Sequence, residues 1–345
     1  MFTRGTLRNL RYLWSLAPGL VTIAGNALGG AWSWANLVFS LGLLAALEWF
    51  VAEDHHNESA STSFLPDLIL ILHAVFQVVA LGALFDSIAG GRIAGIHLIG
   101  AALSTGVHSG SSSIVIAHEL VHRKHLAWQA LGKFLLFTAG NIYFFVEHLR
   151  VHHKWVGTPR DPATARFGEN LYAFFLRSLS GQLSGAIRLE NQRLRHEGKS
   201  TVHPDHYVWR NFTGLLLVSI VCWYFLGWPG LGAWALQILT ANFLLEYTNY
   251  IEHYGLSRRE DERVRETHSW QTDKVVSRFV LIDLSRHSDH HFHASKPYHT
   301  LQTYEKSPVL PGGYASAVLM ALIPPIWFRI VNPRLEQYLQ QIHAT

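Results

Sequence analysis

Long apolar stretches alternate with short polar turns along the first third of the chain, and two more follow later as a hairpin divided by the sequence WPGLG. Each stretch is long enough for a helix that crosses the hydrocarbon core of a bilayer, which is about 30 Å thick. The pattern therefore predicts six membrane-spanning helices, at about 13–31, 35–52, 65–88, 92–117, 212–228 and 231–250.

Two other apolar segments do not fit a simple span. Residues 131–147 carry a lysine and an asparagine, which favours a re-entrant or interfacial helix. Residues 314–331 contain two consecutive prolines, which interrupt a helix, so we expect this segment to lie on the membrane surface. No repeat or Gly/Ser-rich linker divides the chain. The sequence thus predicts one all-α domain, 1–345, a membrane bundle with a helical cap built from 118–210 and 251–345.

The positive charges predict an orientation. Three arginines precede the first predicted span, and the stretch 150–210 holds ten Lys and Arg against five Asp and Glu. The predicted turns near 31–35 and 229–231 hold neither Lys nor Arg. With six spans, both termini and the cap fall on the basic side, which is the cytoplasmic side of a membrane protein. We therefore expect a multi-pass protein of a bacterial-type inner membrane, with its functional site facing the cytoplasm.

Composition supports a membrane protein. Of the 345 residues 49% are hydrophobic and only 15% are charged, against about 25% charged in soluble domains. The sequence pI near 9.2 reflects basic residues beside apolar spans, which favours a lipid surface over nucleic acid as the partner. The single cysteine, Cys222, excludes an intramolecular disulfide and a thiolate cluster.

The chain contains 22 histidines, and many of them fall into clusters on the predicted cytoplasmic side. The clusters read AHELVHRKH, EHLRVHH, NYIEHYG and HSDHH. Their nine candidate ligands are His118, His122, His148, His152, His153, His253, His287, His290 and His291. Nine imidazoles are too many for one metal and suit two, and imidazole binds iron, copper or zinc.

Helical spacing predicts how these side chains pair. Residues three or four apart share a helix face, whereas adjacent residues point about 100° apart. His148 and His152 are therefore expected to face one metal, and His153 another. In the last cluster His287 and His290 are expected to share a face, with the next histidine turned toward the second metal.

The histidines outside these patterns are interpreted as hydrogen-bonded or solvated groups. His125 and His293 lie at the ends of two clusters, three residues from a candidate ligand, and are interpreted as lying outside the set of ligands. The others are His55, His56, His73, His97, His108, His196, His203 and His206. A pH-sensitive patch and a membrane metal transporter remain alternatives for the clusters themselves. A transporter would place its ionisable groups at mid-bilayer, and here they lie at the ends of predicted spans.

The motifs HELVHR, EHLRVHH, NYIEHYGL and LSRHSDHH resemble the membrane alkane monooxygenases of the integral-membrane fatty acyl desaturase and hydroxylase superfamily. Xylene-type monooxygenases share much of the pattern, and the element NYxEHYG separates this branch from ordinary desaturases. The resemblance extends through VGTPRDPATARFGENLYAFFLRSL to RLENQRL. Two departures, Val151 where glycine is common and HELVHR in place of HELGHK, weaken an assignment to medium-chain alkanes.

The resemblance implies a non-haem di-iron centre, held by the nine histidines, that uses O2 to hydroxylate the terminal methyl group of an n-alkane. Alternatives within the superfamily are an aryl-methyl monooxygenase and a fatty acyl desaturase or decarboxylase. The substrate would enter from the bilayer, and electrons would come from rubredoxin or a ferredoxin-type carrier. An acidic carrier would meet the basic cap, where Lys154, Arg160, Arg166 and Arg258 either bind it or anchor the membrane surface.

Five further residues are candidates for the site. Glu119, Glu147, Glu252 and Asp289 adjoin the candidate ligands and are expected to accept hydrogen bonds from imidazole N–H groups, or else to be solvated charges. Ser40, on the second predicted span, is expected to line the substrate channel, where a small side chain leaves room for long chains. The alternative is a serine that packs at a helix–helix contact.

Overall fold

The computed structural model describes residues 8–57 and 64–343, and their regular structure consists of helices. The only strand-like contacts among these residues are two isolated bridges, Glu53 with Lys274 and Gln271 with Val309. The predicted all-α class is therefore confirmed for the described part of the chain.

The first half of the chain forms long helical runs, several of them with π or 3-10 turns inserted. In order these are η1 (Leu10–Leu16), α2 (Ala17–Leu28), η2 (Gly30–Trp34), α3 (Ala35–Val38), η3 (Phe39–Leu43), α4 (Leu44–Phe50), α5 (Leu65–Ala89), α6 (Ile96–His108), η4 (Ser109–Ile114), α7 (Val115–Val121), α8 (Leu126–Thr138), α9 (Phe144–Glu147), η5 (His148–His152) and α10 (His153–Trp155).

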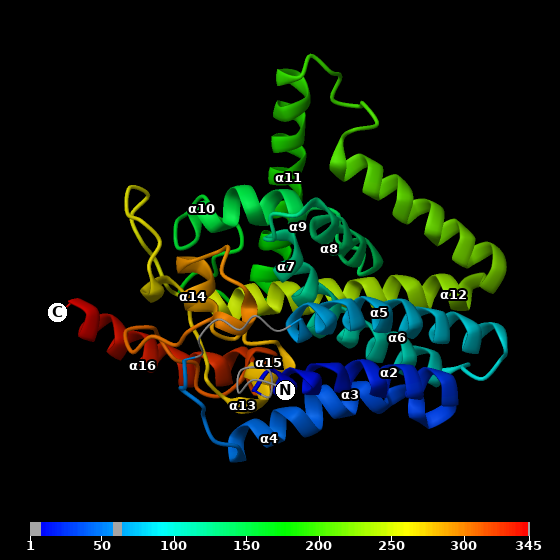
Figure 1. The fold of residues 1–345 in the computed structure, drawn as a ribbon, viewed down its shortest axis with the longest axis horizontal. Coiled ribbons are helices and arrows are strands. Elements are labelled where there is room, and N and C mark those ends of the chain that lie inside the picture. The colour runs from blue at the N-terminus through cyan, green and yellow to red at the C-terminus, as the bar shows by residue number, and fades with distance from the viewer. Residues whose placement is uncertain (1–7, 58–63, 344–345) are drawn as a thin grey trace.

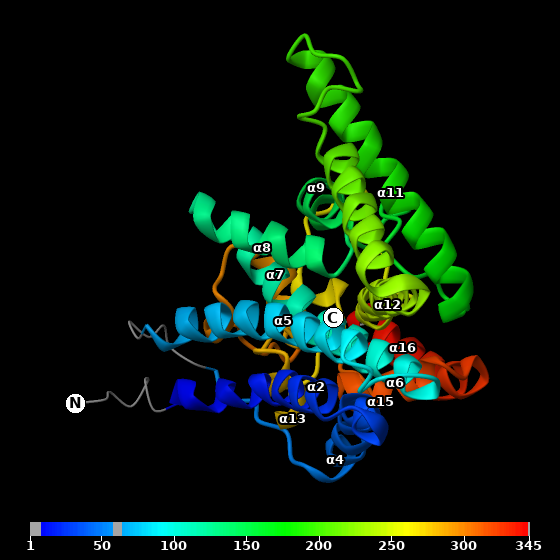
Figure 2. The same cartoon turned by 90° about the vertical axis from the view of Figure 1, so that its right-hand side faces the viewer.

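The second half combines two long helices with short ones. They are α11 (Leu171–His196), α12 (Tyr207–His253), η6 (Glu266–His268), α13 (Val275–Val280), α14 (His287–Phe292), η7 (Tyr298–Thr300), α15 (Tyr314–Ala321) and α16 (Pro324–His343). The helix α12 bends sharply at Gly227, whose backbone has φ 64° and ψ −159°, so it consists of two arms. Both views show α11 and the first arm of α12 projecting from the bundle on the same side (Figures 1 and 2).

The bundle is formed by α2, the run from η2 to α4, α5, the run from α6 to α7, and the second arm of α12, which lie roughly along one direction in Figure 1. The turns after α2 and α5 and the bend of α12 lie together at one end of it. There Gly30 N donates to the Arg92 carbonyl oxygen at 3.3 Å. Glycine is required at position 30 because φ is 52°.

Within the described residues, three helical segments are long and apolar enough to cross a membrane, namely Gly30–Phe50, Leu65–Ala89 and Tyr207–His253. The last contains both predicted hairpin spans, 212–228 and 231–250, one on each side of the bend. The membrane character is thus supported, while the count of six spans and the cytoplasmic cap stay predictions.

One expectation about local structure is wrong. The segment 131–147 is not one helix, because α8 ends at Thr138 and Asn141 Oδ1 then accepts the backbone N–H groups of Tyr143 and Phe144 at the start of α9. The break expected in 314–331 is present, since α15 ends at Ala321 and α16 begins at Pro324. A position on the membrane surface stays a prediction for α16, which also packs against the rest of the protein. Its Trp327 is fully buried, with its ring 5.3 Å from that of Tyr250 on α12.

Candidate metal centre

All nine candidate histidines converge at one place, where they form two neighbouring groups. In each group the nitrogens available as ligands lie within 4.8 Å of one another. Group A contains His118, His122, His148, His153 and His290, and group B contains His152, His253, His287 and His291. The two groups adjoin, since the ring centroids of His152 and His153 are 5.9 Å apart. Histidines separated by up to 173 positions in the sequence thus meet in the fold.

Group A begins at the end of the long run from α6 to α7. His118 lies in the last turn of α7, and His122 is the residue at which this helix ends. Their spacing of four places both in the same group, as the sequence predicts. Their ring centroids are 5.2 Å apart.

The second cluster pairs differently from the prediction. His148 joins His153 in group A and His152 belongs to group B, because residues 148–152 form the π-helix η5. A π-helix closes hydrogen bonds between residues five apart, so positions 148 and 153 come to the same side. Their Nε2 atoms lie 2.9 Å apart.

The last cluster also pairs differently. His287 and His291 share group B, with ring centroids 4.5 Å apart, whereas His290 points into group A. The helix α14 therefore uses its i, i+4 pair for one group, rather than the predicted i, i+3 pair. As predicted, adjacent histidines serve different groups.

The nitrogen geometry fits a metal ion. The Nε2 atoms of His122, His148 and His153 form a triangle with sides of 3.1, 3.1 and 2.9 Å. Metal–imidazole bonds of about 2.1 Å at right angles would place neighbouring nitrogens about 3.0 Å apart. The Nε2 atoms of His118 and His253 are buried and have no hydrogen-bond partner. Buried nitrogens normally have partners, so a cation among these atoms accounts for the arrangement.

Burial favours the form of histidine that binds metals. It lowers the pKa of His118, His148 and His153 well below the usual range, and the neighbouring imidazoles lower it further. The same causes, in the same order, act on the pKa of His290 and His291. These side chains are therefore neutral near pH 7, and each offers a lone pair to a metal.

One of the four predicted carboxylates contacts a candidate ligand. Glu252 Oε2 lies 3.1 Å from His287 Nε2, and its other oxygen accepts a hydrogen bond from Tyr314 Oη at 2.6 Å. Glu147 is buried and neither of its oxygens has a partner. Burial raises the pKa of Glu147 well above its usual range, and the charges of Asp161 and Glu246 add to this effect.

The other two predicted carboxylates have different contacts. Glu119 pairs with Arg123 at 2.7 Å. Asp289 Oδ1 contacts His293 Nδ1 at 2.9 Å, and its second oxygen accepts from the backbone of Gln302 at 2.7 Å. Within the described residues, neither of these two carboxylates contacts a candidate ligand. Asp289 instead holds the loop that follows α14.

Sequence reasoning missed Asp161. Its Oδ2 lies 2.9 Å from His152 Nδ1, and both side chains are buried. Burial acts to raise the pKa of Asp161, but the interactions with His152, the hydrogen bond from Thr164 and the charge of His253 together outweigh it, so the pKa lies below the ordinary value. A carboxylate on the far nitrogen orients a metal-binding imidazole. The only sequence signal was its place in the TPRDP tract nine residues after His152.

His125 and His293 lie outside both groups. His125 caps α8, where its Nδ1 accepts the N–H of Ala127 at 3.2 Å. His293 is half exposed and pairs with Asp289. His55, also interpreted as a non-ligand, lies 3.1 Å from Asp273.

One of the proposed docking residues has a different role. Arg258 is buried, and its guanidinium donates to the carbonyl oxygens of Val156 at 2.7 Å and Lys154 at 2.6 Å. Arg258 therefore holds the backbone that follows η5 and is not available to bind an electron carrier. Lys154, Arg160 and Arg166 are exposed.

An apolar cavity leads to both groups of histidines. Its volume is about 1030 Å³ when its open mouth is included, and its walls come from the run η3–α4, the run α6–α7, the second arm of α12, α13 and α15. His118 and His148 of group A and His287 of group B line it. Ser40 also lines it, as expected for a channel residue, and its Oγ donates to Asn36 Oδ1 at 2.8 Å.

Comparison with known proteins identifies the family. Residues 94–320 match the fatty acid desaturase family. Alkane 1-monooxygenase 1 of Pseudomonas aeruginosa is 41% identical over 246 residues, which are 70% of this chain and 64% of that protein. This chain thus aligns with somewhat less than two thirds of that relative.

Two further relatives align along most of their length. Alkane 1-monooxygenase 2 of Alcanivorax borkumensis is 33% identical over 323 residues, 89% of this chain and 84% of that protein. The xylene/toluene monooxygenase hydroxylase component of Pseudomonas putida is 27% identical over 334 residues, 95% of this chain and 88% of that protein. The resemblance carried by the four histidine motifs is confirmed: the chain belongs to the fatty acid desaturase family, in the branch of the alkane 1-monooxygenases.

Proposed function

We propose that the protein hydroxylates the terminal methyl group of an n-alkane to a primary alcohol, with O2 as co-substrate and two non-haem irons as cofactor. The observation that carries the proposal is the position of the two histidine groups beside the apolar cavity. The reaction is RCH3 + O2 + 2e− + 2H+ → RCH2OH + H2O. Bound iron would supply the O2 activation that no side-chain acid or base can provide.

The chain itself would bind and orient the substrate and exclude water. Polar side chains of the cavity wall are bonded within the protein, as Ser40 is to Asn36 and as Ser111 Oγ is to the Val107 carbonyl oxygen at 2.7 Å. The wall therefore presents mostly carbon atoms, which suits an unfunctionalised hydrocarbon. Such a wall also keeps water from the site during the reaction.

The nine histidines are the proposed iron ligands, with five around one ion and four around the other. Asp161 would orient His152 through the contact with its Nδ1, which leaves Nε2 for the metal. Glu252 lies beside His287. The histidine chemistry alone does not select iron over zinc, so the choice of iron rests on the family.

We propose that the protein spans a bacterial inner membrane six times, with the site facing the cytoplasm. Two contacts support this topology. Tyr12 Oη bonds Asp283, and Asp54 N donates to the Asp273 carbonyl oxygen at 2.9 Å. The segments before α2 and after α4 therefore meet the cap, at the opposite end from the turns after α2 and α5 (Figure 1). This arrangement suits helical hairpins that enter and leave the membrane on the side where the histidines lie.

Electrons are proposed to come from rubredoxin or a ferredoxin-type carrier. An acidic carrier would find Lys154, Arg160 and Arg166 exposed close to η5 and α10. Trp155 lies between two of these cations, with Lys154 Nζ 4.9 Å and Arg160 Cζ 4.4 Å from its ring.

Turnover in whole cells tests the function. The protein is expressed with a reductase and carrier system and given octane, hexadecane, toluene and p-cymene, and the products are identified by mass spectrometry. Primary alcohols from the alkanes support the proposal. Benzylic alcohols alone would favour the aryl-methyl alternative, for which the alignment with the xylene/toluene component over 95% of this chain is the supporting observation. Metal analysis that finds zinc and no iron would exclude both.

Exchange of Ser40 for tryptophan is expected to shorten the range of alkanes that are oxidised. Ser40 lies in the cavity wall, and the indole ring would fill space that the far end of a long chain occupies. We expect hexadecane turnover to fall at least tenfold relative to octane, measured by competition in one culture. Gly42→Trp is the matched control, since Gly42 lies on the same π-helix but points outward, with only Val38 near. An unchanged chain-length profile in Ser40→Trp would exclude the channel role of Ser40.

A further inference from the structure

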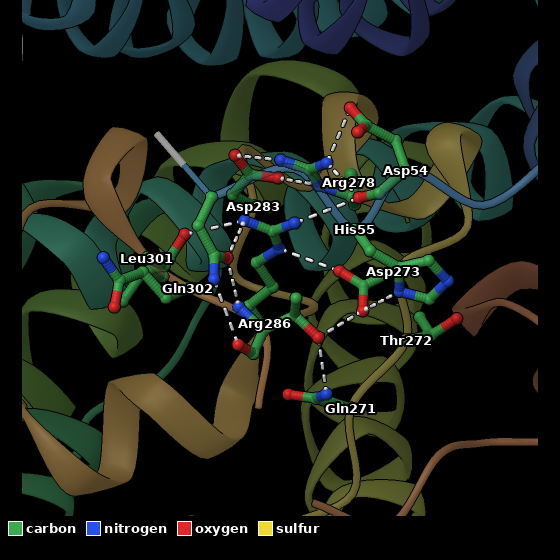
Figure 3. A network of polar contacts seen from close by, with 12 residues as sticks. Asp54, His55, Gln271, Thr272, Asp273, Arg278, Asp283, Arg286, Leu301 and Gln302 are labelled. Carbon is green, nitrogen blue, oxygen red and sulfur yellow. Dashed lines mark hydrogen bonds and ion pairs between the residues drawn. The ribbon is translucent and has the colours of Figure 1, made fainter. Parts of the chain in front are cut away.

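A buried polar network lies beside α14, the helix that carries three candidate ligands (Figure 3). At its centre is Arg286, which is fully buried. Its Nε donates to Asp273 Oδ1 at 2.9 Å. Its other N–H groups face the Leu301, Asp54 and His56 carbonyl oxygens at 2.9, 3.0 and 3.1 Å, and Asn57 Oδ1 at 3.4 Å. The five donors of the guanidinium thus have five acceptors.

A second buried arginine secures the chain just before α14. Arg278 Nε lies 2.6 Å from Asp283 Oδ1, and its Nη1 lies 2.7 Å from Asp54 Oδ2. Ile282 and Asp283 have φ values of 49° and 58°, an unfavourable conformation for residues other than glycine and especially for a β-branched one. A turn of this kind persists only where its surroundings hold it, as the Arg278–Asp283 pair does here.

Both arginines are held by the same short segment, residues 51–57, between α4 and the described start of α5. The carbonyl oxygen of Asp54 accepts from Arg278 and from Arg286 (Figure 3). This segment is distant in sequence from α14 and contributes no candidate ligand. Its backbone nevertheless supplies acceptors to the guanidinium that precedes His287.

Arg286 is also the N-cap residue of α14, directly before its first residue His287. The carbonyl oxygen of Arg286 accepts the backbone N–H groups of Asp289 at 3.1 Å and His290 at 3.4 Å. The position of its guanidinium therefore sets the position of the first turn of the helix. That helix supplies two of the four histidines of group B, and one of the five of group A.

We propose that segment 51–57 fixes the α14 histidines through Arg286, which makes Arg286 a positioning residue for the metal of group B. The proposal rests on the metal centre proposed above. Buried ionic groups contribute little net stability, because desolvation offsets their attraction, and in some proteins they serve instead to fix one geometry. Because α14 is short and carries three candidate ligands, a network that fixes its position bears directly on the geometry of the metal site.

The test compares Arg286→Lys with wild type in the full-length, iron-loaded protein. Lysine keeps the charge but has a single nitrogen with three donors, so it cannot reach five acceptors. We expect the affinity of the group B metal to fall about 10- to 100-fold, as for other residues that orient metal ligands. Iron content after dialysis against a competing chelator then falls from two toward one per chain. In 57Fe Mössbauer spectra the signal of one iron is expected to change more than that of the other.

Arg193→Lys is the matched control. Arg193 also bonds two carboxylates and a carbonyl oxygen, those of Glu190, Glu197 and Asp205, but it lies on α11, which supplies no ligand. Its exchange is expected to lower the melting temperature slightly and leave both iron signals unchanged. Asp273→Asn is a milder second variant that keeps Arg286 and weakens one of its bonds, and it is expected to shift the same iron signal.

The outcomes separate the two proposals. A wild-type protein without two irons would overturn the proposed metal centre. Two irons in wild type, with unchanged iron content and spectra in Arg286→Lys and Asp273→Asn, would overturn the positioning role alone. Equal loss of both irons in these variants would also overturn it, since the network would then support the fold as a whole.

Discussion

Replacement of His291 by alanine is expected to remove one iron per chain and lower alkane hydroxylation to below about one hundredth of the wild-type rate. Residues that only orient ligands already change metal affinity or activity by about 10- to 100-fold, and His291 is itself a proposed ligand. It lies in the four-histidine group, where its Nε2 is 3.2 Å from that of His152. Three donors would remain there, which leaves the ion weakly held.

The matched control is His293→Ala. It lies two positions further along the same HSDHHFH tract, but its side chain is half exposed and pairs with Asp289. Asp289 keeps its bonds to Lys296, Gln302 and Tyr304 in that variant. We expect both irons and most of the activity to be retained. Iron analysis and octanol formation are measured on the same preparations, and equal behaviour of the two variants would contradict the assignment of ligands.

Exchange of Asp161 for asparagine is expected to have the second largest effect. Asparagine has nearly the same shape but removes the charge that faces His152 Nδ1 in a buried site. Without the carboxylate, the imidazole loses the partner that orients it, and we expect about 10- to 100-fold weaker binding of the group B metal. The measurement is iron retention against a chelator, together with alkane turnover.

Asp205→Asn provides the comparison, because Asp205 is exposed and pairs with Lys199 at 2.8 Å. The one histidine that its side chain contacts, His203, belongs to neither group of candidate ligands. The fold is followed by circular dichroism in both variants. Full iron retention in Asp161→Asn would show that His152 needs no carboxylate partner, or that it binds no metal.

Predictions from local spacing succeeded for the first histidine cluster and failed for the second and the last, where His287 shares a group with His291 and not with His290. His118 and His122 end an α-helix and share a group as their spacing requires. The spacing argument failed for His148 and His152, because a π-turn shifts the repeat from four residues to five. The π-helices η3 and η4 likewise interrupt α-helical runs, and their residues Ser40 and Gly110 line the cavity. Sequence patterns carry no simple mark of such turns, since they depend on packing.

Charges were the least predictable part of the site. Arg258 was expected at the surface, but it is buried and donates hydrogen bonds to the carbonyl oxygens of Val156 and Lys154. Asp161 was not expected at all. Whether a charged side chain faces solvent, an imidazole or a carbonyl oxygen depends on residues that are distant in the sequence.

The amino-acid sequence by itself determined the apolar helices, the nine histidines and the family, because apolar length, ligand type and motif spacing are local properties of the chain. Only the tertiary structure decided which histidines share a group and which carboxylates orient them. It also decided that the segment 51–57 reaches Arg286 in front of His287. The physical reason is that a metal site is defined by distances between atoms, and these depend on helix bends, π-turns and buried hydrogen bonds formed between remote parts of the chain.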